Sequence, residues 1–306
     1  MGPLRIAFLL SAGAIACWGQ IIGDVREAIA AHDFAKGDRL IREYRAKSGV
    51  TPEMLEALSW MGRGELAAKQ YDAAERYAAE TRKLALAALT KRPMDQERHL
   101  PIALGASIEV HAQTLAARGE LGEAVTFLHR ELAAYRNTSI RTRIQKNILL
   151  LSLEGKPAPP LEMAHWLGPK PVPLTQLKGH PVLLFFWAHW CGDCKGEAPE
   201  LAKLAAQYKS KGLVLIGPSQ HYGYVAGGDD ASPEQETRYI DEVRLKYYGP
   251  LRGMSVPLSE ENFKNYGAST TPTLVLLDRS GIVRLYHPGA MPYDQLAQKV
   301  AAVAGN

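Results

Sequence analysis

Apolar residues recur at helical spacing through the first half of the chain and gather into short runs in the second half. From Asp24 to about Glu154 the apolar positions repeat every three or four residues, among Ala, Leu, Glu, Arg and Lys, with few β-branched runs. This spacing and these residue types are typical of amphipathic α-helices. The sequence therefore predicts that the first half of the chain is all-α.

Two stretches of the helical half are similar to each other, namely residues 57–81 and residues 107–132, and residues 33–38 resemble a degenerate third copy. The alignment pairs small and aromatic positions at which paired helices touch: Gly62 with Ala112, and Tyr77 with Phe127. These stretches resemble tetratricopeptide repeats, antiparallel helix pairs that stack into a solenoid, although their spacing is irregular and longer than that family's unit. Two interpretations stay open: a concave surface that holds a peptide or partner protein, and an Ala-rich bundle that only packs on its neighbour.

The helical pattern ends at a proline-rich segment, residues 155–160, which cannot continue a helix. Beyond it, stretches of helical spacing alternate with short apolar runs that predict β-strands at residues 182–187, 213–217, 273–278 and 282–286. This alternation predicts an α/β sandwich about one central sheet. The chain is therefore expected to be multidomain, with an all-α helical domain at residues 17–154 followed by an α/β domain at residues 155–306.

The first residues differ from both halves. Arg5 is followed by an apolar run at residues 6–10 and small residues to position 16, and this run is shorter than the roughly 20 apolar residues that span a bilayer. The small-x-small pattern at residues 14–16 is typical of a leader-peptidase site. The sequence predicts a signal peptide at residues 1–16, cleaved before Cys17, and hence a location in the periplasm or cell envelope.

Cys17 leaves two outcomes of this cleavage open. Residues 14–17 resemble the lipobox of bacterial lipoproteins, in which the cysteine is lipidated and anchors the mature protein to the membrane. However, Ala14 stands where Leu is commoner, and Trp18 follows the cysteine. A soluble mature protein is the alternative.

Composition and charge exclude some classes of protein. Charged residues make up 22% of the chain, and Gly and Pro are not enriched enough to indicate disorder. The net charge of +4 is spread thinly, and the densest basic run, at residues 136–146, lacks the interleaved aromatics of a nucleic-acid surface. We interpret this run as a solvated helix face and expect no nucleic-acid partner.

Two of the three cysteines lie three positions apart in a Trp190-Cys191-Gly192-Asp193-Cys194 motif at the predicted start of a helix. A helix N-terminus favours the thiolate form of the first sulfur, so Cys191 is expected to attack and Cys194, one turn inside, to resolve the mixed disulfide. A zinc site is disfavoured because the chain has no second CxxC and no His pair at ligand spacing. We expect no metal and no cofactor other than this switchable disulfide.

The context of the motif adds specificity, because it follows an apolar strand directly (VLLFFWAHWCGDC), and Thr271-Pro272 precedes a later strand. With residues 155–159, residues 177–179 and Pro199, these motifs resemble the thioredoxin superfamily, and within it the TlpA/ResA-like extracytoplasmic reductases. The resemblance covers residues 155–303 and implies a thioredoxin-like thiol:disulfide oxidoreductase. It also implies that Pro272 is cis and faces the cysteines, and that Thr271, Pro272 and Trp190 form the client-binding site.

Three positions near the cysteine motif, Glu197, Phe185 and Ala188, are compared with the matching positions of related families to predict proton transfer and peroxidase activity. ResA-like proteins have a glutamate that matches Glu197, which implies a role in proton transfer at the buried thiol; the alternative is a first-turn glutamate that favours the helix dipole. Phe185 occupies the position of thioredoxin's buried aspartate, so that proton route is absent. Ala188 replaces the threonine of peroxiredoxins, which disfavours peroxidase chemistry.

Asp193 replaces the usual proline after Gly192. Its carboxylate disfavours the Cys191 thiolate, which predicts a reducing potential nearer to that of thioredoxin than to that of the oxidant DsbA. His189 would pull the other way if protonated, but we expect it at the surface, where solvent screens its charge.

These features and the resemblance imply an enzyme that reduces disulfides of exported client proteins with electrons from a membrane donor. The alternatives are a disulfide oxidase or isomerase, and an envelope interaction protein whose helical domain recruits partners. The Gly-rich segment at residues 221–232 is either a cover over the cysteines or a flexible surface loop.

Overall fold

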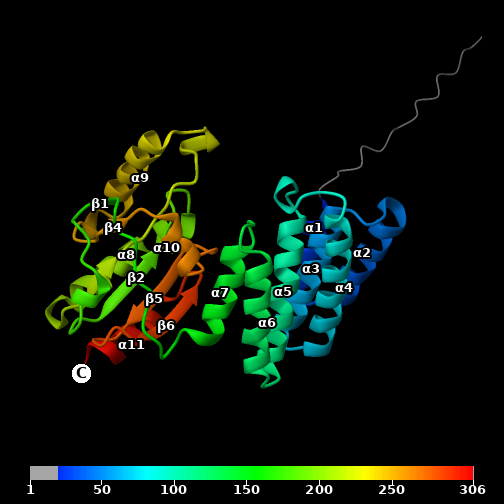
Figure 1. Cartoon of the computed structure of the whole chain (residues 1–306), viewed down its shortest axis with the longest axis horizontal. Coiled ribbons are helices and arrows are strands. Elements are labelled where there is room, and N and C mark those ends of the chain that lie inside the picture. Colours follow the sequence, from blue (N-terminus) through cyan, green and yellow to red (C-terminus); the bar gives the residue numbers. More distant parts are fainter. Residues whose placement is uncertain (1–19, 306) are drawn as a thin grey trace, which may run out of the picture.

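The computed structural model describes residues 20–305, so the predicted signal peptide and Cys17 lie outside the described residues. As predicted, the first half is helical (Figure 1). Its helices are α1 (Gln20–Ala30), α2 (Phe34–Ser48), α3 (Pro52–Ala67), α4 (Tyr71–Leu89), α5 (Leu100–Ala117), α6 (Leu121–Ala134) and α7 (Arg141–Ser152). None of the helices in residues 20–305 is both long and apolar enough to cross a bilayer.

The first six helices form antiparallel pairs, α1 with α2, α3 with α4, and α5 with α6, each joined by a tight turn (Figure 1). The first helices of successive pairs also pack on one another, α1 on α3 and α3 on α5. A Cβ added to Gly62 would lie 3.4 Å from the Cβ of Tyr77, and Ala112 is fully buried. The aligned small positions therefore lie where helices approach closely, while membership of the tetratricopeptide family stays a prediction.

The second half contains the predicted central sheet. In the described residues it has four strands in the order β3-β2-β5-β6, with β2 parallel to β3, and β5 antiparallel to both β2 and β6. The strands are β2 (Val182–Phe186), β3 (Val214–Ile216), β5 (Thr273–Leu277) and β6 (Val283–Pro288). A short pair that the sequence does not predict, β1 (Trp166–Leu167) with β4 (Val256–Pro257), lies outside this sheet.

Helices cover both faces of the sheet; they are α8 (Gly192–Gln207), α9 (Pro233–Tyr247), α10 (Glu260–Asn265) and α11 (Tyr293–Ala304). Leu183 and Phe185 of β2 share an apolar cluster with residues of α8, α9 and α11. Leu184 and Phe186 point the other way, into a cluster with residues of α7 and α10. Because all of β2 is buried, this strand is a rigid support for the residues that follow it.

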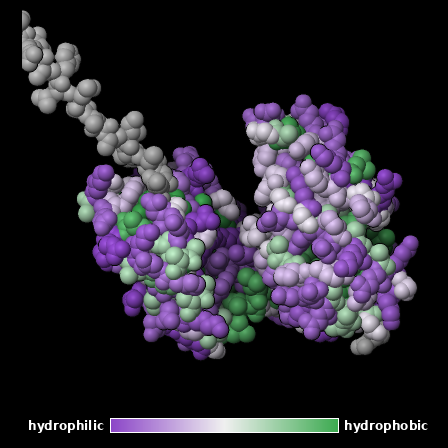
Figure 2. Space-filling model, turned by 180° about the vertical axis from the view of Figure 1, so that it is seen from behind, coloured by the Kyte–Doolittle hydropathy of each residue, from purple (hydrophilic) through white to green (hydrophobic). Residues whose placement is uncertain are grey.

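Helix α7 connects the two halves of the molecule, which Figure 2 shows as separate lobes that meet at a narrower waist. Ile144 and Ile148 of α7 belong to the core of the helical half. Leu149 and Leu153 belong to the cluster beneath the sheet. The side chain of Glu154 also accepts a hydrogen bond from the backbone N–H of Tyr286 in β6, at 3.2 Å. The proposed boundary near residue 155 therefore follows a helix that both halves share.

Gly267 provides a test of this junction. Its φ is +57°, and an added Cβ would clash with the backbone nitrogen of Lys146 in α7. Gly267→Ala should therefore destabilise the folded chain by about 2 kcal/mol, through overpacking and left-handed backbone strain. The measurement is the denaturant midpoint. Gly253→Ala is the control, because a Cβ there has no atom within 4 Å; equal midpoints for the two variants would contradict the prediction.

Candidate active site

The cysteine motif lies between the end of β2 and the start of α8. Cys191 is the N-cap of α8, and its Sγ accepts a hydrogen bond from the backbone N–H of Cys194 at 3.1 Å. The two sulfurs are joined by a disulfide of 2.04 Å. Cys191 is 3% exposed and Cys194 is fully buried, so a partner molecule that reaches the pair meets Cys191 first.

The Thr271–Pro272 peptide bond is cis, as the resemblance implies. Thr273, the next residue, pairs in antiparallel register with Phe186 at the end of β2. The cis proline and the cysteine motif therefore lie at the same edge of the sheet. The Thr271 hydroxyl is buried and has no hydrogen-bond partner within residues 20–305.

Glu197 lies three residues after Cys194 on α8, a spacing that puts the two side chains on one face of the helix. Its Oε1 accepts a hydrogen bond from the backbone N–H of Met291 at 2.7 Å, whereas its buried Oε2 has no partner among the described residues. Burial raises the pKa of the carboxyl, and the negative charge of Asp193 raises it further, against the Met291 hydrogen bond. The raised pKa brings the proton exchange of this carboxyl closer to neutral pH, which favours the proton-transfer role over the helix-dipole role.

An aromatic group packs beneath the motif. Phe185, which replaces thioredoxin's aspartate, is fully buried, and its ring centroid is 5.9 Å from that of Tyr248. Trp187 packs on the same tyrosine at 4.7 Å. Burial and the charge of Glu197 raise the pKa of Tyr248. The rings of Phe185, Trp187 and Tyr248 therefore pack together as a buried aromatic group.

The prediction that His189 lies at the surface is wrong. His189 is 1% exposed, and its Nε2 is 3.1 Å from Oε1 of Glu236 in α9. Its ring is surrounded edge-on by three tyrosine rings, those of Tyr222, Tyr224 and Tyr239. Burial lowers the pKa of His189, so its imidazole is neutral near pH 7 and does not stabilise a Cys191 thiolate as a cation.

The Gly-rich segment at residues 221–232 supplies two of the three tyrosine rings around His189, those of Tyr222 and Tyr224. The ring of Tyr222 lies 5.5 Å from the ring of Trp190 in an edge-to-face arrangement, while Trp190 stays 48% exposed. The segment therefore lies beside the motif, which favours the cover interpretation. Sequence reasoning missed Glu236, which is 47 positions from His189 and carries no local signal.

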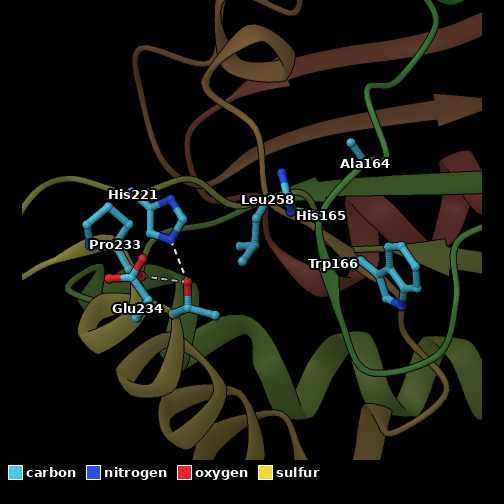
Figure 3. Close-up of a pocket in the computed structure, with 8 residues that line it drawn as sticks. Ala164, His165, Trp166, His221, Pro233, Glu234 and Leu258 are labelled. Carbon is cyan, nitrogen blue, oxygen red and sulfur yellow. Dashed lines mark hydrogen bonds between the residues drawn. The ribbon is translucent and has the colours of Figure 1, made fainter.

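A cavity of about 670 Å³ lies near the start of α9, lined by Ala164, His165, Trp166, His221, Pro233, Glu234, Thr237 and Leu258 (Figure 3). Of the described residues that line it, none belongs to the cysteine motif. Likewise, residues 20–305 contain no cluster of three or more His, Cys, Asp or Glu side chains arranged to hold a metal ion.

Comparisons with known proteins agree with this geometry. The AhpC/TSA family matches residues 155–222. The thiol-disulfide oxidoreductase ResA of Bacillus thuringiensis (strain Al Hakam) is 30% identical over 142 residues, which are 46% of this chain and 73% of that protein. The thioredoxin-like protein YneN of Bacillus subtilis is 28% identical over 48% of this chain and 78% of its own length.

The thiol:disulfide interchange protein DsbE of Xylella fastidiosa (strain Temecula1) is 29% identical over 50% of this chain and 70% of its own length. A solved structure from Chlorobium tepidum, described as a DsbE-type thiol:disulfide interchange protein, is 27% identical with a TM-score of 0.38, over 50% of this chain and 98% of that one. The AhpC/TSA family match and the three curated relatives define a thioredoxin-fold oxidoreductase. The chain belongs to the ResA-like thiol-disulfide oxidoreductases.

The raised pKa of Glu197 predicts a pH dependence of stability. Because folding favours the protonated carboxyl, its contribution to stability is fully present below pH 4.5, the ordinary value, and is lost as the pH rises through the raised pKa of the folded state. Glu197→Gln removes this titration, so the variant should gain stability relative to the wild type as the pH rises. Thermal midpoints from about pH 4 to about pH 8 measure the difference.

The exposed Glu200 on the same helix is the matched control. Glu200→Gln should follow the pH profile of the wild type. If Glu197→Gln also follows that profile, burial does not control the protonation of Glu197.

Proposed function

We propose that this ResA-like enzyme is extracytoplasmic and reduces disulfides of exported client proteins through Cys191 and Cys194. The observation that carries the proposal is the Cys191–Cys194 disulfide at the start of α8, beside the cis Thr271–Pro272 bond. The extracytoplasmic location rests on the predicted signal peptide at residues 1–16, with either a lipidated or an unmodified Cys17.

In the proposed reaction, the Cys191 thiolate attacks one sulfur of a client disulfide. A bond forms between Cys191 and that sulfur, and the other client sulfur leaves as a thiolate. The Cys194 thiolate then attacks the Cys191 sulfur, which re-forms the Cys191–Cys194 disulfide and releases the second client thiol. Two electrons pass from the cysteine pair to the client, and the membrane donor implied by the resemblance restores them.

The N-terminus of α8 supports the role of Cys191 as the attacking residue. The Cys194 N–H that points at the Cys191 sulfur, together with the helix dipole, stabilises a negative charge there. The half-buried Glu197 carboxyl, on the same helix face as Cys194, is suited to accept and return the proton of the resolving thiol.

The residues around the cis bond support a client site. The family resemblance implies that the backbone of Thr271, the residue before the cis Pro272, pairs with the client peptide, and the cis bond is present here. The exposed indole of Trp190 borders the same site.

A second proposal concerns the helical half, which the interaction-protein alternative assigns to partner binding. The guanidinium groups of Arg26 and Arg63 each lie over the ring of Trp60, at 4.6 and 4.7 Å. These side chains come from α1 and α3, the stacked first helices of two pairs. If binding of partner proteins by the helical half is the main function, the full chain with both Cys191 and Cys194 replaced by Ser should bind the same partner proteins as the wild type.

The client is identified by trapping. Cys194→Ser should accumulate a mixed disulfide on Cys191, because the attack proceeds and the resolving thiol is absent, whereas Cys191→Ser should accumulate none. Insulin reduction with dithiothreitol should fall to the uncatalysed rate in Cys191→Ser. Mass spectrometry of the adducts measures the first effect; adducts of equal yield in both variants would mean that Cys191 is not the attacking residue.

The reductive direction is tested at Asp193, an exposed residue in the first turn of α8. Asp193→Asn removes a charge that opposes the Cys191 thiolate, which stabilises the reduced form and should raise the reduction potential by roughly 5–20 mV, the equivalent of ~0.3–1 kcal/mol. Asp193→Pro should also raise it. Redox titration of the full chain measures this, with Asp294→Asn in the first turn of α11 as control. A wild-type potential near that of DsbA, about −120 mV, would rule out the reductive assignment.

A further inference from the structure

The cysteine chemistry does not use one buried ionisable pair, His189 and Glu236, whose side chains are each 1% exposed. Glu236 projects from the first turn of α9, and its carboxylate accepts three hydrogen bonds. The donors are Nε2 of His189 at 3.1 Å, the N–H of Tyr222 at 2.6 Å and the N–H of Gly223 at 2.8 Å. The Glu236 carboxylate of α9 thus hydrogen-bonds both His189, the residue before the cysteine motif, and the Gly-rich segment at residues 221–232.

Burying a carboxylate is costly unless its oxygens are hydrogen-bonded, and here three donors meet that requirement. Burial lowers the pKa of His189 more than the hydrogen bond and charge of Glu236 raise it, so the imidazole is neutral near pH 7 and donates through Nε2–H. The pair is therefore a hydrogen-bonded support rather than an ion pair. It fixes the backbone at Tyr222 and Gly223.

A second contact ties the same segment to α9. The Thr237 hydroxyl donates to the Pro233 carbonyl at 2.7 Å and accepts from Nε2 of His221, also at 2.7 Å (Figure 3). Two successive residues, His221 and Tyr222, are thus held to one helix. This leaves the Tyr222 ring little freedom beside Trp190.

The Tyr222 ring lies edge-on to Trp190, the residue before Cys191, at 5.5 Å. Trp190 is a large apolar side chain that is 48% exposed beside a buried sulfur. An exposed aromatic next to a reactive group, with a second aromatic held against it, is typical of a surface that binds apolar side chains.

We propose that Trp190 and Tyr222 form a subsite for an aromatic or large aliphatic side chain adjacent to the client's cysteine, and that His189 and Glu236 are positioning residues that hold it. This inference deepens the proposed function and rests on it. The subsite selects clients by their flanking residues and takes no part in the transfer of electrons.

The test uses the full chain with dithiothreitol as the reductant and two short peptides, each linked by its single cysteine to glutathione, with Phe on both sides of the cysteine in one and Gly in the other; the uncatalysed rate is subtracted. The wild type should show a lower KM for the Phe peptide. Tyr222→Ala should raise that KM about fivefold, the loss of one aromatic contact, while the KM for the Gly peptide and both kcat values stay unchanged. Tyr222→Phe keeps the ring and should keep the preference.

Glu236→Gln leaves one backbone donor without its acceptor and should weaken the preference in the same direction. Glu242→Gln, at an exposed position of the same helix, is the matched control and should behave as the wild type. An equal KM for both peptides in the wild type, or a preference that survives Tyr222→Ala, would overturn the subsite. Failure of the wild type to turn over either peptide would instead overturn the proposed function, and with it the subsite.

Discussion

The site depends first on the antiparallel pairing of β2 with β5. The register joins Phe186 to Thr273, so the segment that leads to Cys191 and the cis bond before Thr273 emerge at one edge of the sheet. Because β2 is buried on both faces, neither segment can shift without disturbing two apolar clusters. Backbone pairing thus places a redox disulfide beside a peptide-binding edge, although the two motifs are about 80 positions apart.

Helix α7 gives the molecule a second constraint. Its apolar residues are divided between the core of the helical half and the lower face of the sheet. Removing the helical half would therefore uncover part of the thioredoxin-like core. The two halves are better understood as a stacked helical array that ends against a redox domain than as two independent modules.

Two glutamate side chains near the cysteines, Glu197 and Glu236, differ in how many hydrogen bonds their carboxyl groups accept. Glu197 is half-buried with one oxygen lacking a partner among the described residues, and this burial raises the pKa of its carboxyl. Glu236 is buried with three donors and serves as an anchor. Two carboxyls of the same type thus lie in different environments, because the number of hydrogen bonds that each accepts differs.

The all-α first half, the four strands of the central sheet and the cysteine motif at a helix start could be predicted from the sequence, and the resemblance implied the cis proline, because each depends on local periodicity or on a short motif. His189 was misplaced since its burial depends on Glu236 and three tyrosines that are distant in the chain, and the β1–β4 pair was missed because two-residue strands carry no periodic signal. The sequence by itself determined which residues can do redox chemistry. Only the tertiary structure decided what surrounds them, because burial and hydrogen bonding are set by segments that meet after folding.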